Sequence, residues 1–98
     1  DLAGDFRDAS GRIVMAEVHV SPAWIGRPLE ELESSARVRI AFVTRFGEGI
    51  VPAPGTLYQQ GDILHAVMDV AGQDEAERVL AAGPDLDAGP DGQDGDRS

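Results

Sequence analysis

The sequence Phe46-Gly47-Glu48-Gly49-Ile50-Val51-Pro52 lies at the centre of residues 38–70, the segment that decides the fold. Before it, apolar residues alternate over 38–46, which is typical of a pleated strand with one buried face formed by Val38, Ile40 and Phe42. After it, the turn signal Gln60-Gly61-Asp62 precedes a second strand at 62–70, whose buried face is predicted to be Leu64, Ala66, Met68 and Val70. Pro52 and Pro54 allow only a short strand around Ile50-Val51 between them.

Another strand and two helices complete the pattern. A turn at 8–11 precedes an alternating strand whose apolar face is Val14, Ala16, Val18 and Val20. Pro28 suits the first turn of a short helix with Leu29 and Leu32 on one side. A second helix is predicted from a capped start at Asp74 and Glu77, an end at Gly83-Pro84, and the apolar stripe Ala76, Val79 and Leu80. The order β-α-β-β-β-α predicts an α+β fold, a small sheet with helices packed on one face.

The chain of 98 residues is long enough for one small domain. We expect residues 1–12 to be the end of a preceding linker and a turn, 13–83 to form the domain, and 84–98 to be a disordered acidic tail rich in Gly, Asp and Pro. The absence of cysteine excludes disulfides and thiolate metal sites. No apolar run approaches the ~20 residues that span a bilayer, so we expect a cytoplasmic protein without membrane insertion.

The net charge of -10 is unevenly distributed. Residues 13–82 carry ten acids against five arginines, and residues 83–98 add five Asp against one Arg. Because an acidic surface repels phosphates, we expect no nucleic-acid partner.

The second face of the sheet is also partly apolar. Strict alternation places Arg39, Arg45 and His65 on this face, together with Ala41, Val43, Ile63 and Val67. Burying such a surface against a twin domain would contribute roughly 25 cal/mol per Å² and support a small core, so we expect a homodimer through it. The two arginines are expected either to pair with Glu48, Asp62 or Asp69 or to form an anion site in the seam, and His65 to form a partly buried hydrogen bond.

No arrangement of residues indicates catalysis. The two histidines, His19 and His65, lie on different predicted strands, and neither has the spacing of a nucleophile, base and orienting acid. We expect no enzyme activity and no metal site.

The order and spacing of several motifs resemble those of the C-terminal domain of TrkA-type potassium-transport regulators, the RCK-C family. They run from about residue 6 to residue 82 and comprise Glu17-Val18, the segments 26–32 and 39–45, Pro52 and Gly61-Asp62-Ile63-Leu64. The resemblance implies a regulatory domain that dimerises, binds a small ligand at or near the dimer interface and biases a membrane cation channel or transporter. A Rossmann domain precedes this domain in such proteins; because the chain has no Gly-x-Gly-x-x-Gly after a strand, we expect neither NAD nor ATP to bind here.

Some members of the family bind cyclic di-AMP through this domain. The resemblance places Glu33 at the family's acidic position and Ile40 and Pro52 at its aliphatic and proline positions, whereas Ser35 and Arg39 replace a basic residue and an amide. Cyclic di-AMP is therefore one candidate ligand, and the candidate ligand-binding residues in the dimer seam are Glu33, Arg39, Ile40, Arg45, Pro52 and His65.

The predicted function is a ligand-sensing, dimer-forming regulatory domain of a TrkA-type potassium uptake system that gates a membrane cation transporter. Two alternatives stay open. In the first, the chain is a purely structural dimerisation module without its own ligand. In the second, it is an accessory domain of a cation/proton antiporter or a transcription regulator.

Overall fold

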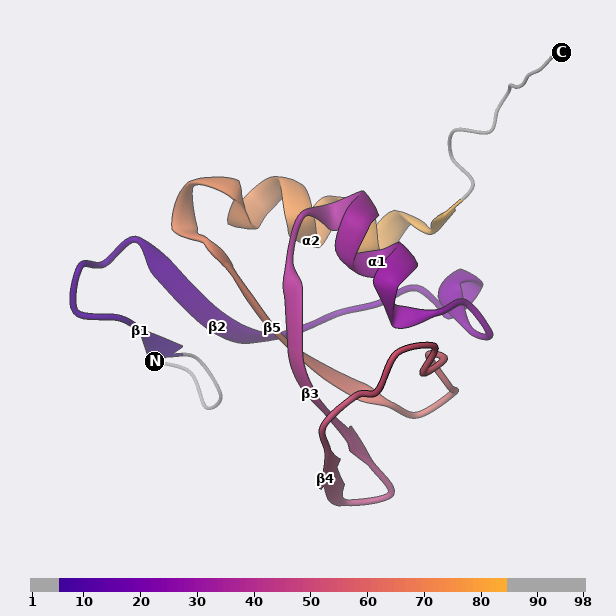
Figure 1. The fold of residues 1–98 in the computed structure, drawn as a ribbon. Helices are drawn as coiled ribbons and strands as arrows, with labels where there is room; N and C mark the ends of the chain where they lie inside the picture. The colour runs from indigo at the N-terminus through magenta and orange to yellow at the C-terminus, as the bar shows by residue number, and fades with distance from the viewer. Residues whose placement is uncertain (1–5, 85–98) are drawn as a thin grey trace, which may run out of the picture.

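Five antiparallel strands and two helices form an α+β fold in the computed structural model, which describes residues 6–84 (Figure 1). The strands lie in the order β1-β2-β5-β3-β4 and comprise β1 (Phe6–Arg7), β2 (Ile13–Val18), β3 (Arg39–Arg45), β4 (Glu48–Ile50) and β5 (Ile63–Asp69). The helices are α1 (Leu29–Ala36) and α2 (Gln73–Ala82), with short 3-10 helices η1 (Pro22–Trp24) and η2 (Val70–Gly72). This confirms the predicted class and, apart from β1, the predicted element order.

The structure adds one strand to the predicted order. β1 lies within residues 1–12, the segment predicted to be a linker and a turn, and pairs antiparallel with β2. The turn after β1 is held by the carboxylate of Asp8, which accepts hydrogen bonds from the amides of Ser10 and Ile13. Of the predicted acidic tail, residues 85–98 lie outside the described residues.

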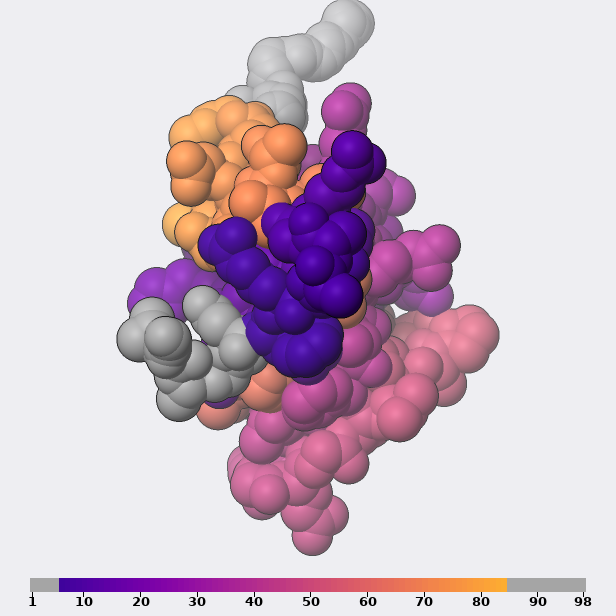
Figure 2. Space-filling model, turned by 90° about the vertical axis from the view of Figure 1, so that its left-hand side faces the viewer, coloured from indigo at the N-terminus to yellow at the C-terminus, as the bar shows by residue number. Residues whose placement is uncertain are grey.

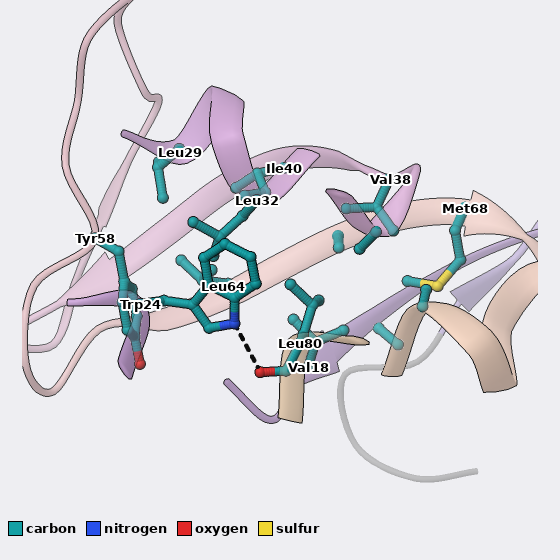
Figure 3. Close-up of a cluster of buried hydrophobic side chains, with 14 of the residues drawn as sticks. Val18, Trp24, Leu29, Leu32, Val38, Ile40, Tyr58, Leu64, Met68 and Leu80 are labelled. Atoms are coloured by element: carbon teal, nitrogen blue, oxygen red, sulfur yellow. Dashed lines mark hydrogen bonds between the residues drawn. The ribbon is translucent and has the colours of Figure 1, made fainter. Parts of the chain in front are cut away.

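Both helices lie on the same side of the sheet, and the core lies between them and the sheet (Figure 1). Trp24 of η1 is 1% exposed, and its indole Nε1 donates a hydrogen bond to the carbonyl of Leu80 at 3.0 Å (Figure 3). This bond joins η1 to α2. The predicted core faces of β2 and β5 are confirmed, since Val14, Ala16, Val18, Leu64, Ala66 and Met68 are all buried.

The prediction for β3 is wrong in its second half. Ile40 pairs with Ala66 but Phe42 pairs with His65, so the register shifts at Ala41 as in a β-bulge. The extra residue reverses the alternation that follows it. Val43 is therefore fully buried, whereas Phe42 lies on the other side of the sheet.

The helix ends agree only partly with the predicted signals. Pro28 was expected in the first turn of α1 and is instead its N-cap, directly before Leu29, while the C-cap is Arg37, whose φ of 62° is left-handed. The predicted cap of α2 by Asp74 and Glu77 is wrong, because the N-cap is Gly72 and no side chain caps it. Instead, η2 leads into α2, and the amide of Gln73 donates to the carbonyl of Val70.

The loop between β4 and β5 is fixed against the start of α1. The amide of Leu29 donates to the carbonyl of Thr56 at 2.8 Å, and the amide of Tyr58 donates to the carbonyl of Arg27 at 2.9 Å. Because Tyr58 is also buried, these bonds hold residues 52–58 beside α1.

Candidate ligand site and outer sheet face

Three of the six candidate ligand residues meet at one cavity. Glu33, Ile40 and Pro52 line a cavity of about 200 Å³, which also has Leu29, Glu30, Ala53 and Pro54 in its wall. The residues come from α1, the start of β3 and the fixed loop after β4. Glu30 and the loop residues 53–54 were missed by sequence reasoning, because their proximity depends on contacts between distant segments.

The two carboxylates at this cavity hold its walls in place. Glu33 Oε2 accepts a hydrogen bond from the amide of Ile40 at 2.9 Å, and Glu30 Oε2 accepts one from the amide of Gly55 at 3.0 Å. The Gly55 amide is the main reason that the pKa of Glu30 is lowered from its ordinary value. The cavity is therefore shaped by hydrogen bonds within the chain.

Arg39 lies next to this cavity but does not line it. A broad, open depression of about 630 Å³ adjoins the cavity, since Glu30 and Glu33 line both, and Arg37 and Arg39 line the depression. Neither arginine forms an ion pair within 4.0 Å among the described residues. The depression thus has two arginines beside three carboxylates, Glu30, Glu33 and Asp69, of which the two glutamates already accept backbone hydrogen bonds.

Arg45 was predicted to share the second sheet face with His65, and this is wrong because the bulge at Ala41 turns it to the core side. Its Nε and Nη2 donate to Oδ1 and Oδ2 of Asp62 at 2.9 and 2.8 Å. Asp62 was one of the partners expected from the sequence. The Arg45–Asp62 ion pair thus joins the end of β3 to the turn before β5.

Asp62 is held as a carboxylate although its side chain is only 1% exposed. Burial alone would raise its pKa, but the hydrogen bonds from Arg45 and from the Gln59 amide, with the charge of Arg45, bring the pKa below the ordinary value. Burial, together with the charge of Asp62, raises the pKa of Tyr58.

His65 lies on the side of the sheet that faces away from the helices. Its ring stacks on Phe42 with a centroid distance of 4.0 Å and an interplanar angle of 11°, and its Nε2 is hydrogen-bonded to Thr44 Oγ1 at 3.0 Å. Phe42 and Thr44 were missed here because strict alternation assigned them to the core side. The expected partly buried hydrogen bond of His65 is present.

We call this side of the sheet the outer face. Strand registers place on it the residues Ile13, Met15, Glu17, Arg39, Phe42, Thr44, Ile63, His65, Val67 and Asp69. Most of its apolar residues are only partly buried, Ile63 is 41% exposed, and Phe6, opposite Met15, is 60% exposed. No described helix covers this face.

The described residues contain neither a metal-binding cluster nor a membrane helix. No group of three or more His, Cys, Asp or Glu side chains in residues 6–84 is placed to hold a metal ion. Over the same residues, neither helix has the length and apolar character needed to cross a membrane.

No family model matches the chain, but a comparison with curated proteins finds a relative. The Trk system potassium uptake protein TrkA of Streptomyces coelicolor (strain ATCC BAA-471 / A3(2) / M145) is 39% identical over 84 residues, which are 86% of this chain. The chain spans 38% of the length of that relative. Fold and similarity together define the class as a small α+β domain related to potassium uptake proteins. Within that class the chain is a homologue of TrkA, which confirms the resemblance inferred from its motifs.

Proposed function

We propose that this chain is a cytoplasmic regulatory domain of a TrkA-type potassium uptake system. The similarity to TrkA over 86% of the chain carries the proposal. The domain acts on a membrane cation transporter through the larger protein of which such domains are part. It works by binding and conformational bias, without an enzymatic step.

The domain pairs with a second copy through the outer face. The two described helices cover only the opposite side of the sheet, so the apolar residues Met15, Phe42 and Val67 need another cover. The face also carries charges of both signs, Arg39 against Glu17 and Asp69, and a copy related by two-fold symmetry can place unlike charges opposite one another.

A small ligand binds at the cavity beside α1. Leu29, Ile40 and Pro52 give it apolar walls, while Arg37 and Arg39 in the adjoining depression provide positive charge for an anionic group. A cyclic dinucleotide combines flat bases with phosphates, so cyclic di-AMP is the first ligand to test. A ligand that prefers one arrangement of two paired copies shifts their population and passes that bias to the transporter.

A structural dimerisation module without its own ligand is the second candidate. One observation favours it: Glu33, the acidic residue expected to read a ligand, already accepts the Ile40 amide. In that case the carboxylate serves the fold alone.

A thermal-shift screen separates the two candidates. Cyclic di-AMP, mononucleotides and potassium are each added to the 98-residue chain, and a ligand of the folded state must raise Tm by mass action. The variant Ala53→Trp fills the cavity from an exposed position and is expected to abolish the shift. Ala71→Trp, also exposed but outside the cavity, is the matched control and keeps the shift.

The result of the thermal-shift screen decides between ligand sensing and a dimerisation module without a ligand. A shift that Ala53→Trp removes and Ala71→Trp keeps supports ligand sensing at this cavity. If no compound raises Tm at millimolar concentration, the sensing role fails and the dimerisation module stands. A shift that survives in Ala53→Trp places the ligand elsewhere and contradicts the proposed site.

A further inference from the structure

The turn between β3 and β4 presents an aromatic residue to solvent at an energetic cost. Arg45 pairs with Glu48, so Phe46 and Gly47 form a two-residue hairpin loop, with φ values of 53° and 78°. Both positive values are those of a type I′ turn, in which Asn is favoured at the first position because it tolerates left-handed backbone. An aromatic residue there is strained.

Burial does not explain Phe46, because its side chain is 94% exposed. The hairpin extends away from the helices at the lower end of the molecule (Figures 1 and 2). An exposed aromatic residue at a strained position buries almost no surface in the isolated fold, whereas aromatic residues, Phe included, are enriched at the cores of protein interfaces.

A hollow suited to such a side chain lies next to Phe46 itself. Its volume is about 240 Å³, and Phe46, Gly47, Gly61 and Ile63 are among the residues that line it. Gly47 and Gly61 add no side chains, and a Cβ at either position would meet no atom within 4 Å. An engineered cavity of roughly 150 Å³ accepts benzene in another protein, so the hollow has room for a phenyl ring.

The hollow is continuous with the outer face. Thr44 and Ile63 belong to the outer face, pair with each other in the sheet and line the hollow. An interface across the outer face therefore reaches Phe46 at its end. In a two-fold contact the same patch of each copy faces the other. Because Phe46 lies beside the hollow, each copy can insert its Phe46 into the hollow of the other.

We propose that Phe46 is the anchor of the contact between two copies of this chain, inserted into the hollow beside Phe46 of the other copy. The inference rests on the proposed pairing through the outer face and adds the residue that fixes its register. It also explains why the turn carries Phe-Gly rather than the less strained Asn-Gly.

The first test compares Phe46→Asn with the wild-type 98-residue chain by sedimentation equilibrium and thermal melting. Asn relieves the strain, so Tm at a concentration where both chains are monomeric is expected to rise by several degrees, while the dimer dissociation constant rises at least tenfold. Val51→Asn is the matched control, because Val51 is 81% exposed but outside the hollow, and it is expected to leave the dissociation constant within twofold.

The result separates this inference from the proposed pairing. A wild-type chain that is monomeric at every concentration overturns both. A wild-type dimer whose dissociation constant is unchanged in Phe46→Asn, or changed equally in Val51→Asn, overturns the anchor and leaves the pairing standing.

A second test locates the receptor. A photoreactive p-benzoylphenylalanine replaces Phe46 in one isotopically labelled copy, which is mixed with unlabelled wild type and irradiated. Cross-links between copies are expected at residues 44–47 or 60–63 of the partner. Cross-links to the helices, or none between copies, overturn the assignment.

Discussion

Arg45 and Asp62 form a two-point ion pair that joins the last residue of β3 to the turn before β5. Nε and Nη2 of the arginine donate to the two carboxylate oxygens, and Oδ2 of Asp62 also accepts the amide of Gln59 at 2.9 Å. Arg45 Nη2 additionally donates to the carbonyl of Leu57 at 3.1 Å. The Asp62 carboxylate thus binds both the end of β3, which leads into the β3–β4 hairpin, and the loop that precedes β5.

Removing this charge is expected to destabilise the chain. Asp62→Asn keeps the shape but loses a charge-assisted bond, so the free energy of unfolding at pH 7 should fall by about 2 kcal/mol. Urea titration followed by fluorescence of Trp24, the sole tryptophan, measures it at fixed protein concentration. Glu75→Gln, at the exposed Arg78–Glu75 pair, is the control and should change little.

The same pair predicts a pH dependence. Because the folded-state pKa of Asp62 is lowered, its stabilising contribution is complete above the unfolded value of about 3.9 and is lost as pH falls through the folded value. The difference in unfolding free energy between wild type and Asp62→Asn should therefore shrink when pH is lowered from 7 to below 3. A difference that stays constant or grows over that range would contradict the assignment.

Trp24→Phe should loosen the contact between η1 and α2. The substitution keeps an aromatic ring but removes the indole donor from the carbonyl of Leu80, which then accepts only the Ser21 amide, and it creates unfilled space. We expect a loss of about 2 to 3 kcal/mol, measured by circular dichroism in urea. A loss below about 0.5 kcal/mol would show that the bond to Leu80 is unimportant.

Arg37→Gly should stabilise the domain. Arg37 ends α1 with a left-handed φ of 62°, its side chain is exposed, and glycine adopts this conformation without strain. The gain is expected to be about 0.5 kcal/mol after the greater freedom of glycine in the unfolded chain is subtracted. Thermal melting at several protein concentrations tests this, and a lower Tm at all of them would contradict it.

Variants of Glu33 test whether its carboxylate at the cavity stabilises the fold or serves only to contact a ligand. Its carboxylate accepts the Ile40 amide, so Glu33→Ala should cost about 1 to 2 kcal/mol of stability, while Glu33→Gln retains an acceptor and should cost less than half as much. Urea titration of both variants measures these losses. If the two substitutions cost the same, the hydrogen bond does not hold the start of β3.

Much of the fold follows from local patterns. β2 and β5 pair without irregularity, so simple alternation identified the buried residues Val14 and Leu64 and their neighbours. α1 was also predictable, because Pro28 precedes it and Leu29 and Leu32 share its buried side. These elements need no information from distant parts of the chain.

The bulge at Ala41 was not predictable in the same way. Residues 39–45 are all compatible with a regular strand, and the register shift becomes visible only when β3 is paired with β5. That shift moved Arg45 and Val43 to the core side and placed Phe42 beside His65. The cavity was half predicted for a similar reason, since the bond between Glu30 and Gly55 joins residues 25 positions apart.

Pairing of two copies through the outer face is the central claim, and Val67→Glu tests it most directly. Val67 lies at the middle of that face, between Met15 and Arg39, so a charge there should disrupt the contact without entering the core. Val51→Glu places the same charge at an exposed residue outside the face. In sedimentation equilibrium we predict dimers for the wild-type chain and Val51→Glu and a folded monomer for Val67→Glu. A wild-type monomer, or a Val67→Glu dimer of wild-type affinity, would contradict the account.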